Sequence, residues 1–142
     1  IKNSPAMNVL ANRAMMGVAE LGKHYGTLFE RAVKEHVTPT KLNGARYYDK
    51  EFNQESSDIE VFVGIKEKEK ADVVMEPCEC AMTVHRGGYS TLSEAYGAVV
   101  SWIIENGYEI AGAPFDLYIK THFDSLLPEE WETEVYFPVR KK

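Results

Sequence analysis

Residues 58–65 read Asp-Ile-Glu-Val-Phe-Val-Gly-Ile, and residues 132–139 read Glu-Thr-Glu-Val-Tyr-Phe-Pro-Val. The two stretches match at an offset of 74 residues, from Glu60 to Glu134. In both, aliphatic side chains alternate with polar or aromatic ones, which is typical of a β-strand whose two faces have different surroundings. The predicted fold follows from this alternation and from its occurrence in two places along the chain.

Further matches follow in the same order along the chain. They join His24–Thr27 to Ala95–Ala98 and Gly17 and Leu21 to Gly88 and Leu92, all at an offset of 71, and Tyr48 to Tyr118 at an offset of 70. Four matched sets in one order indicate an internal duplication. We therefore expect a single domain over residues 1–142 with repeats 1–65 and 78–142. Residues 66–77 join the repeats, and we interpret the charge run Lys66–Lys70 as a solvated turn.

Each repeat contains one helical pattern between strand patterns. The first repeat predicts a strand over residues 5–15, a helix with an apolar stripe from Val18 to Val33, and strands over 45–52 and 58–65. The second predicts a strand over 80–85, a helix from Leu92 that ends at Asn106-Gly107, and strands over 114–123 and 131–139. The fold class is therefore α+β. Two pseudo-symmetric strand-helix-strand-strand repeats form an antiparallel sheet, with both helices on one face and a ligand groove on the other.

The last strand of each repeat separates aliphatic from functional side chains. Successive side chains of a strand point to opposite faces. We expect the helices to cover one set: Ile59, Val61, Val63 and Ile65, and their equivalents Thr133, Val135, Phe137 and Val139. Glu60 and Phe62, and likewise Glu134 and Tyr136, then lie on the uncovered face.

The preceding strands are expected to extend this uncovered face. Phe115, Leu117 and Ile119 are interpreted as directed to the core, which turns Asp116 and Tyr118 toward Glu134. By the repeat, Arg46 and Tyr48 are their counterparts. Aromatic rings beside carboxylates suit a flat, apolar, often cationic ligand. The candidate ligand-binding residues are Glu134, Asp116, Tyr118, Tyr136, Tyr48 and Phe62.

Two alternatives stay open for these residues. An antiparallel sheet often has one solvated face that carries charges and tyrosines without any ligand. Glu60, in particular, also fits a cross-strand ion pair with Arg46.

Composition narrows the classes of function. A net charge of −6 with scattered basic residues argues against a nucleic-acid-binding face, so any DNA contact would come from a domain outside this chain. No apolar run is long enough for a membrane span, and we expect a cytoplasmic protein. We expect Cys78 and Cys80 to be reduced and structural, and we expect no metal site, cofactor or catalytic nucleophile–base pair. Whether the protein forms a homodimer stays open.

Several motifs together resemble one protein family. Ala81–Tyr89, Glu94–Gly97, Glu105–Glu109 and Thr133–Val139 are similar to GyrI-like domains, the effector-binding domains of bacterial MerR-type and AraC-type transcription regulators. The resemblance covers essentially the whole chain. It implies a ligand groove between the repeats, where Asp116 and Glu134 with Tyr118, Tyr136 and Tyr48 would hold cationic aromatic compounds. The family usually has a longer carboxylate in place of Asp116, and Gly-Pro-Pro in place of Lys41–Gly44.

Three functions are compatible with this resemblance. The first is the effector sensor of a transcription regulator. The chain begins at Ile1 rather than Met, which suggests either that it was cut from a longer protein or that its start is missing, and the first interpretation agrees with a sensor domain. The second is a stand-alone protein that binds drugs or toxins, or that acts on DNA gyrase. The third is a hydrolase of cyclopropane-containing natural products, with Glu134 as general base and Tyr118 or Tyr136 as proton donor.

Overall fold

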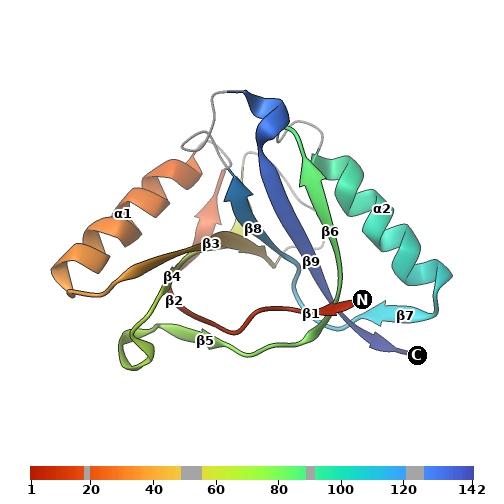
Figure 1. Cartoon of the computed structure of the whole chain (residues 1–142), viewed down its shortest axis with the longest axis horizontal. Helices are drawn as coiled ribbons and strands as arrows, with labels where there is room; N and C mark the ends of the chain where they lie inside the picture. Colours follow the sequence, from red (N-terminus) through yellow and green to blue (C-terminus); the bar gives the residue numbers. More distant parts are fainter. Residues whose placement is uncertain (18–19, 49–55, 89–91, 121–126) are drawn as a thin grey trace. The chain divides into compact units, whose positions relative to one another are not determined.

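The computed structural model describes residues 1–17, 20–48, 56–88, 92–120 and 127–142. These residues form two compact units. We call Pro5–Glu76 the N-terminal unit, and Pro77–Lys142 with Ile1–Ser4 the C-terminal unit. In each unit a helix packs against antiparallel strands (Figure 1). The predicted α+β class is therefore confirmed.

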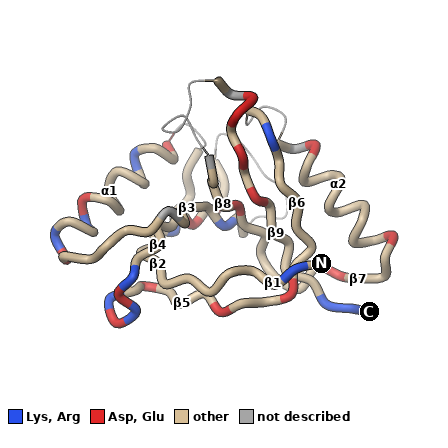
Figure 2. The backbone as a smooth tube through the Cα atoms, in the orientation of Figure 1, with Lys and Arg blue, Asp and Glu red and all other residues tan. Residues whose placement is uncertain are grey.

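The described residues of the N-terminal unit form one helix and four strands. Its elements are β2 (Met7–Met16), α1 (Leu21–Lys34), β3 (Pro39–Tyr47), β4 (Ser57–Ile65), a short 3-10 turn (Lys68–Lys70) and β5 (Val73–Met75). The strand order is β3-β4-β2-β5, and every pairing is antiparallel. Acidic and basic residues alternate in the loop between β4 and β5 (Figure 2).

The core of this unit lies between α1 and one face of its strands. Leu28 and Ala32 of the amphipathic helix pack against the aliphatic side chains of β4, which are Ile59, Val61, Val63 and Ile65. The alternation predicted for this strand is confirmed. Gly64, on the other face, lies where β3 passes very close: a Cβ atom there would be 2.9 Å from the Leu42 carbonyl oxygen, which excludes a larger residue without a backbone shift.

The described residues of the C-terminal unit form a similar arrangement of one helix and five strands. Its elements are β1 (Lys2–Asn3), β6 (Glu79–Arg86), α2 (Leu92–Glu105), β7 (Tyr108–Ile110), β8 (Phe115–Lys120), a 3-10 turn (Pro128–Glu130) and β9 (Glu132–Lys141). The strand order is β1-β6-β9-β8, and β7 pairs with the end of β9. Val99 and Ile103 of α2 pack on Val135, Phe137 and Val139.

The predicted helix end is also confirmed. Gly107, two residues after the end of α2 at Glu105, adopts φ +76°, a conformation that glycine reaches without a Cβ penalty. The amide groups of Asn106 and Gly107 donate to the carbonyl oxygens of Trp102 and Ile104. These bonds satisfy carbonyl groups that a helix end otherwise leaves open.

Some boundaries differ from those predicted. β3 begins at Pro39 rather than Ala45, and β1, β5 and β7 were not predicted because two or three residues carry no periodic signal. β5 lies within the predicted joint 66–77, where it pairs with β2. Val18 and the predicted strand ends at 49–52 and 121–123 lie outside the described residues. None of the helices in the described part of the chain is long and apolar enough to cross a membrane.

A pair of substitutions in α1 tests this packing. Leu28 is 1% exposed within the core and Val33 is 75% exposed on the same helix. We expect Leu28→Ala to lower the free energy of unfolding by about 2–5 kcal/mol, because it leaves a cavity. Val33→Ala is the matched control and should change the free energy of unfolding by no more than about 0.5 kcal/mol. Urea unfolding followed by circular dichroism measures both, and equal effects would contradict the described packing of α1.

Candidate ligand-binding faces

The register between β8 and β9 decides which side chains share a face. In an antiparallel pair, residues directly opposite each other project to the same side of the sheet. Glu134 lies opposite Leu117, and Tyr136 lies opposite Phe115. We call the side of these residues, away from α2, the C-terminal face. It consists of Cys80, Met82, Val84 and Arg86 from β6, Phe115 and Leu117 from β8, and Glu132, Glu134, Tyr136 and Pro138 from β9.

Asp116 and Tyr118 lie on the opposite, helix-covered side. Asp116 is opposite Val135 and Tyr118 is opposite Thr133. The Asp116 side chain is 0% exposed, and the Tyr96 hydroxyl of α2 donates a hydrogen bond to its Oδ2 atom. The prediction that Asp116 and Tyr118 converge with Glu134 and Tyr136 is therefore wrong.

The error arose because β8 is buried on both sides, with Phe115 and Leu117 on one side and Asp116 on the other. Phe115 and Leu117 are buried as predicted, but on the C-terminal face rather than against α2. Tyr118 lies opposite Thr133, and Tyr47 lies opposite Ile59 at the equivalent place in the N-terminal unit. The structural equivalent of Tyr118 is therefore Tyr47, at an offset of 71 residues. The sequence match had paired Tyr118 with Tyr48, at an offset of 70. The offset of 71 had already appeared in the helices and was the signal that would have corrected the match.

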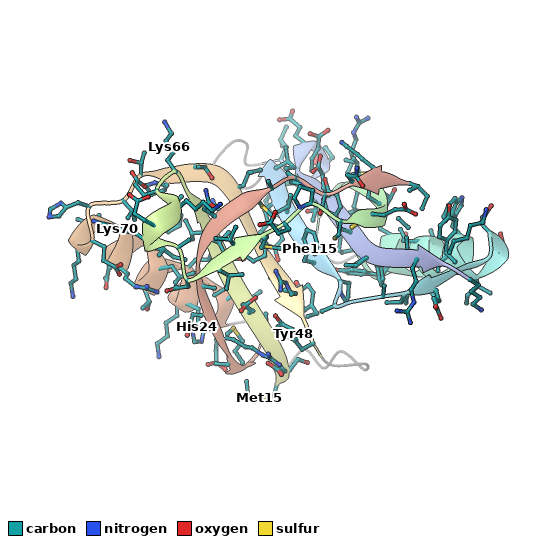
Figure 3. The ribbon with its side chains drawn as sticks, turned by 90° about the horizontal axis from the view of Figure 1, so that it is seen from below. Met15, His24, Tyr48, Lys66, Lys70 and Phe115 are labelled. Atoms are coloured by element: carbon teal, nitrogen blue, oxygen red, sulfur yellow. The ribbon has the colours of Figure 1, made fainter. Side chains whose placement is uncertain are left out.

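Glu134 and Tyr136 form the polar centre of the C-terminal face. The Tyr136 hydroxyl donates to Glu134 Oε1 at 2.8 Å. Its ring is 1% exposed and stacks on Phe115, with centroids 5.0 Å apart and planes at 10°; Figure 3 labels Phe115 on β8. Burial, reinforced by the Glu134 hydrogen bond and charge, raises the pKa of Tyr136 well above its usual value, so the phenol stays a neutral donor.

The two carboxylates of the C-terminal face differ in their partners. Glu132 pairs with Arg86, whose Nε lies 3.0 Å from Glu132 Oε1. Glu134 forms no ion pair within the described residues, and its hydrogen bond comes from the neutral phenol of Tyr136. Glu134 is half-buried. The residues opposite it on the two neighbouring strands are Leu117 of β8 and the exposed Val84 of β6.

The equivalent face of the N-terminal unit, which we call the N-terminal face, is internally neutralised. Arg13 makes two hydrogen bonds to Asp58, at 3.0 and 2.8 Å, and its guanidinium carbon lies 3.6 Å from the centroid of the Tyr48 ring. The Tyr48 hydroxyl donates to Glu60 Oε1 at 3.1 Å, and Arg46 Nε lies 3.7 Å from the same oxygen. The alternative of an Arg46–Glu60 ion pair is confirmed. Two cations thus face two carboxylates.

The other two predicted ligand-binding residues, Tyr48 and Phe62, are buried to different degrees. Tyr48 is half-buried at the end of β3 (Figure 3), and burial raises its pKa. Phe62 is on the predicted face, opposite Ala11 and Gly44, but is fully buried. Arg13, Phe115 and Leu117 were missed, because β2 was not assigned to faces and β8 was assigned to the wrong ones.

The titration of Tyr136 tests the Glu134–Tyr136 pair. Because its pKa is raised, Tyr136 should ionise above the usual tyrosine range, and its contribution to stability should be present below the usual tyrosine pKa and lost as the pH rises above it. Ultraviolet absorbance during an alkaline titration measures tyrosinate formation. Tyr136→Phe should remove a titration step that lies above the usual tyrosine pKa, and Glu134→Gln should move that step to lower pH. If Tyr136→Phe removed a tyrosine of ordinary pKa, the described pair would be contradicted.

Comparison with known proteins identifies a family that matches this chain. The GyrI-like small molecule binding domain family matches residues 1–140. No curated protein matches the sequence.

Several solved structures resemble the fold, among them two of EcmrR and one of a hydrolase. The EcmrR chain of an EcmrR–DNA complex aligns with a TM-score of 0.89 and 24% identity over 99% of this chain, which spans only 56% of that chain. The C-terminal domain of EcmrR aligns with a TM-score of 0.81 and 24% identity, covering 99% of this chain and 96% of that one. A hydrolase from Listeria innocua aligns with a TM-score of 0.69 and 15% identity, covering 98% and 90%. At these identities the structural likeness shows the fold, and the match over residues 1–140 shows that the chain belongs to the GyrI-like small molecule binding domain family.

Proposed function

We propose that this domain binds a small, aromatic, cationic molecule at Glu134 on the C-terminal face and acts as the ligand-sensing part of a transcription regulator. The observation that carries the proposal is the state of Glu134. It is half-buried, and within the described residues its carboxylate is hydrogen-bonded by a neutral phenol and not paired with a cation.

A partly buried carboxylate without a cation favours a cationic ligand. Burial weakens solvation of the charge, and a ligand cation would restore favourable electrostatics in a medium of lower dielectric constant than water. The hydroxyl of Tyr136 fixes the carboxylate without neutralising it. The stacked rings of Tyr136 and Phe115, together with Leu117, are buried next to Glu134 and lower the local dielectric constant. The exposed Val84, opposite Glu134 on β6, adds apolar surface that an aromatic ligand could contact.

The N-terminal face shows what such a cation does when the protein itself supplies it. Arg13 lies over the Tyr48 ring and binds Asp58, so the ring face and the carboxylate are already occupied. A ligand cation that used Tyr48 would have to displace Arg13. We therefore place the charge-recognition site at Glu134, with Tyr136 as its positioning residue, and give Tyr48 and Phe62 no direct role in binding the charge.

The regulatory part of the proposal is supported by the structural likeness to EcmrR. The EcmrR chain that resembles this fold is described in complex with DNA, and it is longer than the present chain. The scattered basic residues and net charge of −6 here do not suit a DNA-binding surface. DNA contact would therefore belong to another part of such a regulator. An upstream coding sequence with a helix-turn-helix segment in the same reading frame would support this part of the proposal, and a start codon immediately before Ile1 would overturn it.

A comparison of two neighbouring carboxylates tests the ligand site. We expect Glu134→Gln to weaken binding of the flat aromatic cation ethidium by about 1–3 kcal/mol, because the ligand charge would lose its partner. This corresponds to about a 5- to 150-fold rise in Kd. Glu132→Gln is the matched control: it lies on the same strand and face but already pairs with Arg86, so its effect should be much smaller.

Fluorescence titration measures both variants. The anionic dye fluorescein should bind wild-type protein more weakly than ethidium does, and Glu134→Gln should reduce that difference. Ethidium affinity that is unchanged in Glu134→Gln, or reduced equally in Glu132→Gln, would show that Glu134 does not recognise the charge.

A further inference from the structure

The C-terminal unit holds two free cysteines with adjacent sulfur atoms. Cys78 Sγ lies 3.6 Å from Cys80 Sγ; Cys78 is exposed and Cys80 is buried. We propose that Cys78 and Cys80 form a dithiol site that captures trivalent, thiol-reactive metalloid compounds, specifically organoarsenicals. This inference is independent of the proposed recognition of a cation at Glu134.

The backbone holds the two thiols side by side. Side chains two residues apart on an extended chain project in the same direction. β1 pairs with β6 next to the site, where Lys2 lies opposite Cys80. The buried Ser4 extends this contact, since its amide donates to the Cys78 carbonyl oxygen at 2.9 Å and its hydroxyl oxygen accepts from the Cys78 amide at 3.0 Å. Two chain segments therefore fix the spacing of the sulfurs.

The sulfur separation suits a bridging atom better than a direct bond. An atom about 2.3 Å from each sulfur, a typical metal–thiolate length, would subtend an angle of about 100° at a separation of 3.6 Å. That angle is close to the one preferred by three-coordinate, pyramidal arsenic. A disulfide would require the sulfurs to approach by about 1.6 Å, to the usual bond length of about 2.05 Å.

The number of protein ligands separates an organoarsenical from a metal ion. A structural zinc ion takes four protein ligands. Among the described residues, no group of three or more His, Cys, Asp or Glu side chains is placed to hold a metal. An organoarsenic centre brings its own carbon ligand and needs only two sulfurs to complete three bonds. Two thiols are therefore a complete site for it.

The protonation state of the buried thiol points the same way. Burial and the hydrogen bond with Cys78 raise the pKa of Cys80 to about 12, so this thiol is neutral near pH 7. A metal ion would require thiolates. With an arsine oxide, two As–S bonds form while the As–O double bond breaks, and the two thiol protons leave with the oxygen as one water molecule. No atom changes oxidation state, and the exposed Cys78 can react first, before Cys80 closes the ring.

Phenylarsine oxide is a direct probe of this site. The sequence contains only these two cysteines, so the reaction reports on them alone. Intact-mass spectrometry of wild-type protein should show one phenylarsine adduct, and a colorimetric thiol assay should show the loss of both free thiols. The adduct should survive excess glutathione, a monothiol, and be removed by the dithiol dithiothreitol.

Single substitutions distinguish a two-sulfur site from reaction at one exposed thiol. In Cys78→Ser and in Cys80→Ser, the lifetime of any adduct in glutathione should fall by about 100-fold, because the second linked bond is lost. Cys78→Ser decides the test if Cys80→Ser fails to fold by circular dichroism, since Cys78 is exposed. A wild-type adduct that glutathione removes, or an equally stable adduct in Cys78→Ser, would overturn the proposal.

Discussion

The alternation of side chains along β4 and β9 determines which residues form the core of each unit and which lie on the face away from the helix. Each strand presents aliphatic side chains to a helix and a carboxylate followed by an aromatic ring to the other side. A shift of one residue in either strand would place Glu60 or Glu134 under a helix and leave the aliphatic residues without their core. Burial of the aliphatic side chains therefore fixes where the functional side chains lie.

The two repeats share this architecture but differ in their charge balance. In the N-terminal unit, Arg13 and Arg46 neutralise Asp58 and Glu60, and Arg13 covers the Tyr48 ring. In the C-terminal unit, the residue opposite Glu134 on β8 is Leu117. In the N-terminal unit, the residue opposite Glu60 on β3 is Arg46. The duplication thus supplies two equivalent positions. Glu60 lies opposite Arg13 and Arg46, whereas Glu134 lies opposite Val84 and Leu117. This lack of opposing basic residues distinguishes the position that we propose to bind a cation.

Much of the fold, and part of the site, could be predicted from the sequence. Strong alternation identified the faces of β4 and β9, and a helical stripe that ends at Asn106-Gly107 identified α2. β8 could not be assigned in this way, because Phe115, Asp116 and Leu117 are consecutive and all buried. Where both faces of a strand are covered, the polarity of its residues no longer indicates the face to which each side chain points. The burial of Asp116 depends on Tyr96 from α2, a tertiary contact that no local pattern contains.

Carboxyl labelling distinguishes the side chains of β8 and β9 that lie on the C-terminal face from those buried under α2. A water-soluble carbodiimide with an amine nucleophile modifies accessible carboxylates, and peptide mass mapping locates each modified residue. Glu134, half-buried on the C-terminal face, should be modified, while the fully buried Asp116 should be protected in folded protein and modified only after unfolding. Modification of Asp116 together with protection of Glu134 in the native protein would contradict this assignment of the two faces.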